Sequence, residues 1–154
     1  MTSIGQDLRG SSDLFEPKPR QIWKIDDKKI RFIPEDKRNL HDYRYVLVVM
    51  NEDLCNLSNK VYNVIPLSTK GSPDFLRYPL KKECFSKNAD EELTYKSQSL
   101  LVVNHYQPVN SEYLEAPSMG SLKEEIYESV LLMIKENLLG MIEDVSETDI
   151  NEYL

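Results

Sequence analysis

Short hydrophobic runs separated by polar turns dominate the chain between residues 21 and 103. Residues 46–49, Val-Leu-Val-Val, are β-branched and apolar on both faces, which predicts a central strand of a barrel. Pro66 indicates a bulge or the end of its strand. The pattern predicts these short strands: Gln21–Ile25, Ile30–Ile33, which pairs back on the first, Arg44–Met50, Lys60–Leu67, Phe75–Leu80 and Ser99–Val103.

The pattern changes to a helical period near residue 121. Ser121 and Glu124 have the spacing of a capping box, and Gly140 supplies a stop signal. Between them, apolar residues recur at helical spacing: Leu122, Ile126, Val130, Met133, Ile134 and Leu138. Several antiparallel strands followed by one packed helix predict a mainly β fold with a C-terminal helix, closed as a small barrel.

The chain of 154 residues is long enough for one packed domain. We expect a flexible N-terminal arm (residues 1–18), a barrel domain (residues 19–140) and an acidic C-terminal tail (residues 141–154). The longest strongly apolar stretch, residues 45–50, is far shorter than the roughly 20 residues of a membrane span, and no signal-peptide core is visible. The sequence therefore predicts a cytoplasmic protein with no membrane contact, in which Cys55 and Cys84 are free thiols.

The net charge of −7 argues at first against a nucleic-acid partner. Residues 143–154 hold five acids and no Lys or Arg, so the rest of the chain carries 19 positive and 21 negative side chains, a net −2. Much of the acidity therefore belongs to the tail, and a polyanionic partner stays possible for the domain.

Candidate chemistry is limited to polar residues near strand ends. The two histidines, His41 and His105, have no metal-site spacing, and the common nucleotide-binding and serine-hydrolase motifs are absent, so no metal or cofactor is expected. Arg44 opens one strand, Ser68 and Thr69 end the next, and Asn104 and His105 follow the last. A guanidinium, a hydroxyl and an imidazole in one cleft can hold a phosphodiester and move protons. The alternative is that these are ordinary solvated residues at the rim of the fold.

The order of the short blocks is more specific than any one of them. Ile22-Trp23, residues 44–51, residues 64–69, residues 99–109 and the helix ending at Gly140 together resemble the MazF/PemK family. That family consists of toxin–antitoxin endoribonucleases with an SH3-like barrel of the PemK/CcdB type. The resemblance covers about residues 19–140.

The resemblance implies a cleavage site at Arg44 and Ser68, with Thr69 as the alternative hydroxyl. The RNA 2′-hydroxyl would be the nucleophile, and no metal would be needed. The chain departs from the family pattern at Tyr45, where the family has proline, at Ser68, where it has threonine, and at residues 104–107, where it has D/E-Q-x-R. His105 is then a candidate for the missing proton transfer, paired with His41. The expected RNA-binding residues are His41, Thr69, Lys70, Asn104 and Gln107.

The resulting hypothesis is a type II toxin: a homodimeric, sequence-specific, metal-independent endoribonuclease that cleaves single-stranded RNA and is neutralised by a cognate antitoxin. The departures leave a second interpretation, a non-catalytic PemK/CcdB-like barrel that binds an antitoxin or a topoisomerase subunit. A third is an unrelated SH3-like module with an aromatic peptide groove. The acidic tail either folds over an RNA groove or is a solvated tail.

Overall fold

The computed structural model describes residues 16–33, 40–56, 60–95 and 99–141. Nearly all of the predicted N-terminal arm and acidic tail lies outside the described residues. None of the described helices has the length and apolar character needed to cross a lipid bilayer.

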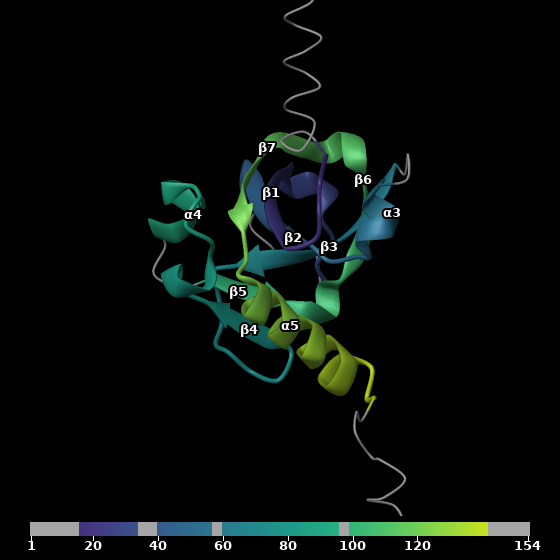
Figure 1. The fold of residues 1–154 in the computed structure, drawn as a ribbon, viewed down its shortest axis with the longest axis vertical. Coiled ribbons are helices and arrows are strands. Elements are labelled where there is room, and N and C mark those ends of the chain that lie inside the picture. The colour runs from purple at the N-terminus through teal and green to yellow at the C-terminus, as the bar shows by residue number, and fades with distance from the viewer. Residues whose placement is uncertain (1–15, 34–39, 57–59, 96–98, 142–154) are drawn as a thin grey trace, which may run out of the picture.

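One antiparallel sheet of seven strands curves around the core (Figure 1). Its strand order is β4-β5-β3-β2-β1-β7, and β6 pairs with β3. The strands are β1 (Gln21–Asp26), β2 (Tyr43–Val48), β3 (Val61–Ser68), β4 (Arg77–Leu80), β5 (Ser99–Val102), β6 (Gln107–Asn110) and β7 (Leu114–Ser121). The predicted mainly β fold with a C-terminal helix is confirmed.

Three short α-helices flank the sheet: α3 (Glu52–Asn56), α4 (Glu91–Tyr95) and α5 (Glu124–Met133), which continues as a π-helical turn at Ile134–Leu138. Single 3-10 turns lie at Asp27–Lys29, Lys82–Cys84, Val103–His105 and Ser111–Tyr113. The predicted cap at Ser121 is wrong, because Ser121 is the last residue of β7 and its carbonyl accepts the N–H of Ser86. The predicted stop is confirmed: Gly140 has φ +66°, a conformation that favours glycine.

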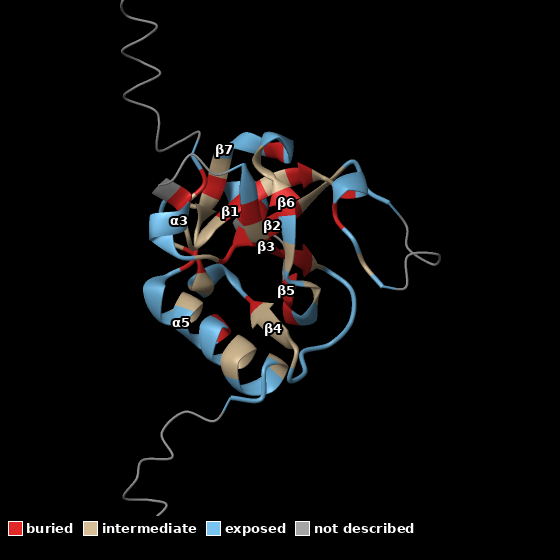
Figure 2. Ribbon diagram, turned by 90° about the vertical axis from the view of Figure 1, so that its right-hand side faces the viewer, coloured by how far each residue is buried: buried red, intermediate tan, exposed pale blue. Residues whose placement is uncertain are grey.

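The central strands are buried on both faces, as their sequence predicts. Alternate residues of β1, β2 and β3 enter two separate apolar clusters, so Trp23, Val46 and Val64 lie in one cluster while Ile22 and Leu47 lie in the other. Helix α5 covers the second cluster through the fully buried Val130. Figure 2 shows the buried residues concentrated in the strands, with exposed residues along the outer side of α5.

Pro66 lies inside β3 rather than at a bulge or strand end, opposite Val46 of β2. Along the edge of β3 that faces away from β2, the pairing strand changes at Pro66: β6 pairs with residues 61–64 and β5 pairs with residues 67–68. Proline lacks an N–H, and at this change of partner no ladder hydrogen bond is lost.

Residues 30–33 do not form the predicted strand, and side chains from β6 and the turn before it explain why. The N–H of Arg31 donates to Gln107 Oε1 (2.9 Å), and Gln107 Nε2 donates back to the carbonyl of Arg31 (3.0 Å). The N–H of Ile33 donates to Nε2 of His105 (3.1 Å). Side chains thus satisfy the backbone groups that a neighbouring strand would otherwise bond.

Candidate active site

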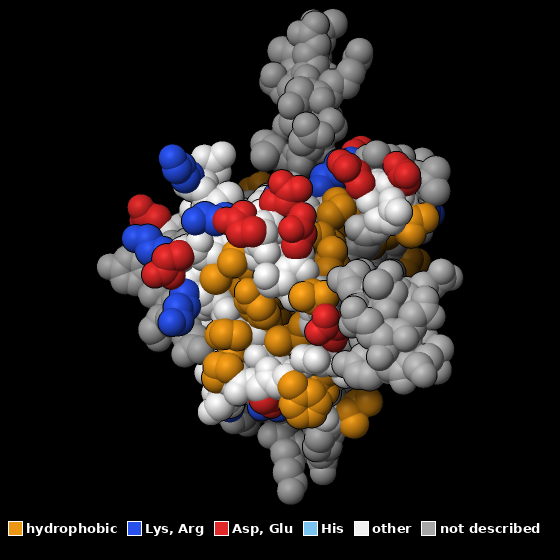
Figure 3. All heavy atoms as spheres, turned by 60° about the horizontal axis from the view of Figure 1, so that its bottom comes forward, with side chains coloured by type: hydrophobic (Ala, Val, Ile, Leu, Met, Phe, Trp, Pro, Cys, Tyr) orange, Lys and Arg blue, Asp and Glu red, His pale blue; other side chains and the backbone are white. Residues whose placement is uncertain are grey.

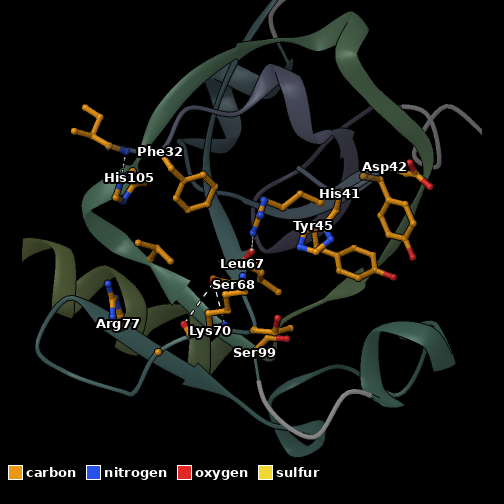
Figure 4. Close-up of a pocket in the computed structure, with 16 residues that line it drawn as sticks. Phe32, His41, Asp42, Tyr45, Leu67, Ser68, Lys70, Arg77, Ser99 and His105 are labelled. Carbon is orange, nitrogen blue, oxygen red and sulfur yellow. Dashed lines mark hydrogen bonds between the residues drawn. The ribbon is translucent and has the colours of Figure 1, made fainter. Parts of the chain in front are cut away.

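A pocket of about 620 Å³ opens where β2, β3, β4 and β5 meet the segment after β1 (Figure 4). Six of the eight predicted site residues line it: His41, Arg44, Ser68, Thr69, Lys70 and His105. Asn104 and Gln107 are not among its lining residues. The structure therefore brings a guanidinium, two hydroxyls and two imidazoles to one cleft.

Strand register brings Arg44 and Ser68 together across 24 positions of sequence. Strands β2 and β3 pair antiparallel with Val46 opposite Pro66, and the same register continued by two residues places Arg44 opposite Ser68. Directly opposed residues of antiparallel strands project to the same face. Arg44 Nη1 donates to the carbonyl of Leu67 (2.8 Å), so the guanidinium lies at the end of β3.

The guanidinium of Arg44 is held on several sides. Its Nε and Nη2 atoms donate to Asp27 Oδ1 (2.7 Å) and Oδ2 (3.4 Å), and Asp27 is fully buried. The ring of Phe32 lies 4.6 Å from Arg44 Cζ, a cation–π contact. Of the five N–H bonds of a guanidinium, three are used by Asp27 and Leu67, which leaves two for a ligand.

Asp27 is not itself a lining residue of the pocket, but it holds two residues that are. Besides the ion pair with Arg44, its Oδ2 accepts the backbone N–H of His41 (2.9 Å), so one carboxylate fixes two predicted site residues. Burial lowers the pKa of Arg44 from its ordinary value, but a guanidinium in a protein keeps its proton. The pocket therefore presents a fixed positive charge.

Ser68 ends β3 in a tight turn. Its Oγ accepts the backbone N–H of Lys70 (3.2 Å), while its own O–H has only a long contact to the carbonyl of Lys70 (3.5 Å). Ser68 is half-buried, and Thr69 and Lys70 are exposed. The hydroxyl of Ser68 is thus oriented by the turn and can donate to a ligand in the pocket.

His105 is engaged at both ring nitrogens. Nε2 accepts the N–H of Ile33, and Nδ1 lies 3.2 Å from Asn104 Oδ1, which fits a neutral ring carrying its proton on Nδ1. Burial, and secondly the charge of Arg77, lower the pKa of His105. The ring also contacts Phe32, with centroids 5.0 Å apart. His105 and Gln107 therefore hold residues 31–33, and through them Phe32, beside Arg44.

Comparison with known proteins adds structural neighbours only. No family model matches the chain, and no curated protein sequence matches it. Among solved structures, the Mycobacterium tuberculosis toxin MazF-mt6 is 15% identical, with a TM-score of 0.55 over 80% of this chain and 99% of the toxin. MazF from Deinococcus radiodurans is 13% identical, with a TM-score of 0.55 over 81% of this chain and 97% of the neighbour. A MazE–MazF complex from the same organism matches at 11% identity and a TM-score of 0.56, over 82% of this chain and 97% of the matched one.

This chain has the MazF fold. The resemblance carried by five short blocks of sequence is thereby confirmed at the level of the fold. The match spans nearly the whole length of each neighbour and about four fifths of this chain. At 11–15% identity it shows the fold alone.

The sequence analysis missed two lining residues that shape the chemistry of the pocket, Phe32 and Arg77, and the buried Asp27 that holds Arg44 from behind the lining. Asp27 stands in an Asp-Asp pair that signals a turn, and the sequence does not show which of the two is buried. Phe32 belonged to a predicted strand that does not form, and Arg77 to a strand with no other polar signal. The sequence indicates the ion pair only through these two adjacent acids and the arginine that opens a later strand.

Tyr45, which replaces the proline of the family pattern, forms part of the pocket wall. Its neighbour Tyr43 donates a hydrogen bond to Glu92, which also pairs with Lys24. Burial, followed by hydrogen bonding with Glu92, raises the pKa of Tyr45. The phenol of Tyr45 thus keeps its proton at neutral pH and is excluded as a general base.

The lining of the pocket is positive although the whole chain is negative. Arg44, Lys70 and Arg77 contribute cations, and Asp42 is the acid in the lining. Within the described residues no group of three or more His, Cys, Asp or Glu side chains is arranged to hold a metal ion. The pocket is suited to an anionic ligand.

Proposed function

We propose that the chain is the toxin of a type II toxin–antitoxin system and cleaves single-stranded RNA in the cytoplasm without a metal ion. The observation that carries this proposal is the geometry of Arg44 on a MazF fold. Its guanidinium is fixed by a buried carboxylate opposite Ser68 and keeps two N–H bonds for a ligand. Fixed donors of this kind stabilise charge that develops in a transition state.

The reaction proposed for this site is internal transesterification. The RNA 2′-hydroxyl attacks the adjacent phosphorus, the bond to the 5′-oxygen breaks, and the products carry a 2′,3′-cyclic phosphate and a 5′-hydroxyl. The remaining N–H bonds of Arg44 donate to the non-bridging oxygens, where negative charge accumulates in the pentavalent transition state. The hydroxyl of Ser68 donates to the same phosphate and orients it.

Proton transfer is assigned to His41 rather than to His105. Both ring nitrogens of His105 are engaged, whereas the ring of His41 has no hydrogen bond within the described residues. His41 lines the pocket, and its backbone is fixed by the same carboxylate that holds Arg44. An imidazole in this position can accept the 2′-hydroxyl proton or protonate the leaving oxygen.

The neighbours support a protein partner. One structural neighbour is a MazE–MazF complex, and another, from a mycobacterial species, is an endoribonuclease in complex with its cognate antitoxin. We therefore include a cognate antitoxin in the proposal. Neutralisation by co-expression of an acidic protein encoded next to this chain would support it, and failure of every adjacent small protein to relieve toxicity would contradict it.

A second copy of the chain is the proposed partner of the face formed by α5. Leu131 and Leu132 on α5 and Met141 beyond it are exposed, and Leu139 and Phe75 are more than 60% exposed, at 62% and 68%. Figure 3 shows hydrophobic side chains gathered on this face. Exposed apolar groups of this kind mark protein contacts. Analytical ultracentrifugation should show a dimer that Leu132→Glu dissociates, whereas a wild-type monomer would contradict the assignment.

The proposal is tested by cleavage of single-stranded RNA in buffer with EDTA. The wild-type protein should cleave, and the cleaved 3′ ends should carry a cyclic phosphate. Arg44→Lys keeps the charge but loses the fork that contacts both Asp27 and the phosphate, so it should not cleave. Lys82→Gln changes an exposed lysine outside the pocket and should cleave normally. No cleavage by the wild type, or cleavage that EDTA abolishes, would contradict the proposal.

The non-catalytic alternative makes a different prediction. A MazF-fold protein that acts only by binding a partner would arrest growth when expressed, and Arg44→Lys would arrest growth equally. The departures from the family pattern at Tyr45, Ser68 and residues 104–107 favour this alternative. Retention of toxicity by Arg44→Lys, without RNA cleavage by the wild type, would establish it.

A further inference from the structure

Arg77, the first residue of β4, projects into the same pocket as Arg44 and Ser68. Ser68 pairs with Leu100 of β5, and Arg77 pairs with Val102 two residues further along the same strand. Residues two apart on a strand share a face, and directly opposed residues share it with them. The register therefore places Arg77 and Ser68 on one face of the sheet, and both line the pocket (Figure 4).

The backbone of Arg77 is anchored on both sides. It pairs with Val102 in β5, and it forms a two-way bridge with Asp74, in which each backbone N–H donates to the carbonyl of the other. The carboxylate of Asp74 is turned to the N–H of Leu76 (2.8 Å). The acid nearest to Arg77 in sequence is thus used in the turn and not as a partner for the guanidinium.

The guanidinium of Arg77 lies against Gly71 in the turn that follows Ser68. A Cβ atom on Gly71 would stand 2.8 Å from Arg77 Nη1, and Gly71 has φ +97°, so glycine here leaves room for the guanidinium. A side chain at position 71 would displace the arginine from its place. The turn that orients the Ser68 hydroxyl and the space that holds Arg77 are therefore parts of one local structure.

Arg77 differs from Arg44 in having no acceptor for its side chain. No hydrogen bond or ion pair joins its guanidinium to another group in the described part of the chain, although the residue is half-buried. Its five N–H donors, in a partly desolvated pocket, thus have no acceptor among the described residues. An anionic ligand with several oxygens satisfies them best, because arginine matches phosphate oxygens in a bidentate arrangement.

We propose that Arg77 binds a phosphate of the RNA substrate and contributes to RNA affinity rather than to the chemical step. This inference rests on the proposed function, because it assumes that RNA occupies the pocket. Arg44 is held by protein groups, whereas the guanidinium of Arg77 has no acceptor within the described residues. A phosphate contact that is equally strong in the bound substrate and in the transition state adds affinity without changing kcat. One charge-assisted phosphate contact predicts about a tenfold loss of affinity on removal and a salt dependence reduced by about one counterion.

The experiment measures binding separately from cleavage. An oligonucleotide that the wild type cleaves is prepared with 2′-O-methyl groups throughout, which removes the nucleophile, and its Kd is measured by fluorescence anisotropy at several salt concentrations. Arg77→Gln should raise Kd about tenfold and lower the salt slope by about one. Arg77→Lys should lie between Arg77→Gln and the wild type, because it keeps the charge without the fork. Lys82→Gln, which removes the same charge outside the pocket, should change Kd less than twofold.

Cleavage kinetics complete the test. With unmodified RNA, Arg77→Gln should raise KM about tenfold and leave kcat within about threefold of the wild type. Unchanged Kd and KM in Arg77→Gln would overturn the inference while leaving the proposed function intact. An equal loss in Lys82→Gln would also overturn it, because the effect would then be one of net charge. A wild-type protein that neither binds nor cleaves RNA would overturn both.

Discussion

The two arginines of the pocket differ in how the protein holds them. Arg44 is fixed by the buried carboxylate of Asp27, by the carbonyl of Leu67 and by the ring of Phe32. Arg77 has a fixed backbone, and its guanidinium lies against the turn at Gly71 without a hydrogen bond or ion pair to any other described residue. The same side chain is thus preorganised on one side of the pocket and adjustable on the other. Preorganised donors stabilise a transition state, whereas a contact that is equal in the bound substrate and the transition state adds only affinity.

The buried ion pair is better explained by position than by stability. Removing two charges from water costs several kcal/mol per ion, and a buried pair is often no more stable than apolar residues of similar volume. Asp27 is fully buried, and besides Arg44 it fixes the backbone of His41. We infer that this carboxylate is retained because it aims two groups at the pocket. Variants in which the free energy of unfolding and RNA cleavage are measured separately test that inference.

The largest effect is expected when the fixed arginine is removed. Arg44→Gln should lower kcat by about 10³-fold, because it removes the donors that face the phosphate. It should also lower the free energy of unfolding by about 3 kcal/mol, because the carboxylate of Asp27 stays buried and loses its ion pair with Arg44. RNA cleavage and urea unfolding measure the two effects.

The double variant Arg44→Gln/Asp27→Asn separates the loss of cleavage from the loss of stability. It leaves no buried charge, so most of the lost stability should return, while cleavage should stay as low as in Arg44→Gln. Recovery of cleavage together with stability would show that Arg44 acts only on the fold.

The second largest effect distinguishes the two histidines. His41→Gln should lower kcat by about 10²-fold, because it removes the group assigned to proton transfer. His105→Gln should stay within about threefold of the wild type, because both nitrogens of His105 are used in holding the chain. The two variants are compared at saturating RNA, and the reverse order would restore His105 as the proton-transfer residue.

A smaller effect is expected at Ser68. Ser68→Ala should lower kcat about tenfold through the loss of one hydrogen bond to the phosphate, and Ser68→Thr, which keeps the hydroxyl, should remain active. Ser72→Ala in the same exposed loop is the matched control. Equal activity of Ser68→Ala and Ser72→Ala would assign the hydroxyl of Ser68 to the turn alone.

The fold was predictable where strands are buried on both faces. Strands β2 and β3 contribute to both apolar clusters and β5 to one of them, so most of their residues are apolar. Strand β7 carries exposed residues at positions 115–117 and a glycine at 120, and it pairs with β1 through its backbone. Its sequence therefore lacks the alternation of apolar and polar residues that predicts a strand. Strand β6 is four residues long and contains Pro108. A strand that pairs through its backbone and buries only one or two side chains leaves little pattern in the sequence.

The site was predictable only where a strand end marks it. Arg44 and Ser68 directly bound apolar runs, and both line the pocket. Arg77 joins them only through the register of β4 against β5, which sequence does not specify. In the Asp-Asp pair, Asp26 caps the 3-10 turn by accepting the N–H of Lys28, while Asp27 turns inward to Arg44. Two identical neighbouring side chains thus have opposite roles that tertiary contacts decide.

The smallest expected effect is a pH dependence of the free energy of unfolding that arises from His105, whose pKa depends in part on Arg77. Because burial and the charge of Arg77 lower the pKa of His105, the folded protein binds fewer protons at this site than the unfolded chain. The free energy of unfolding should therefore fall as the pH drops below about 6.5, where the ring in the unfolded chain becomes charged. Protonation also turns Nε2 into a donor and breaks its bond from the N–H of Ile33.

Urea unfolding between about pH 7.5 and pH 5 measures this loss, which should stay below about 1 kcal/mol because the site is partly solvated. His105→Gln should flatten the profile, since glutamine accepts the same N–H without titrating. Arg77→Gln should shift the titration of His105, followed by NMR, toward higher pH. The variant removes the charge of Arg77, which is one of the two causes that lower the pKa of His105. If the pKa of His105 in the wild type is at or above its ordinary value, or if it does not change in Arg77→Gln, then the guanidinium of Arg77 does not lie close to His105.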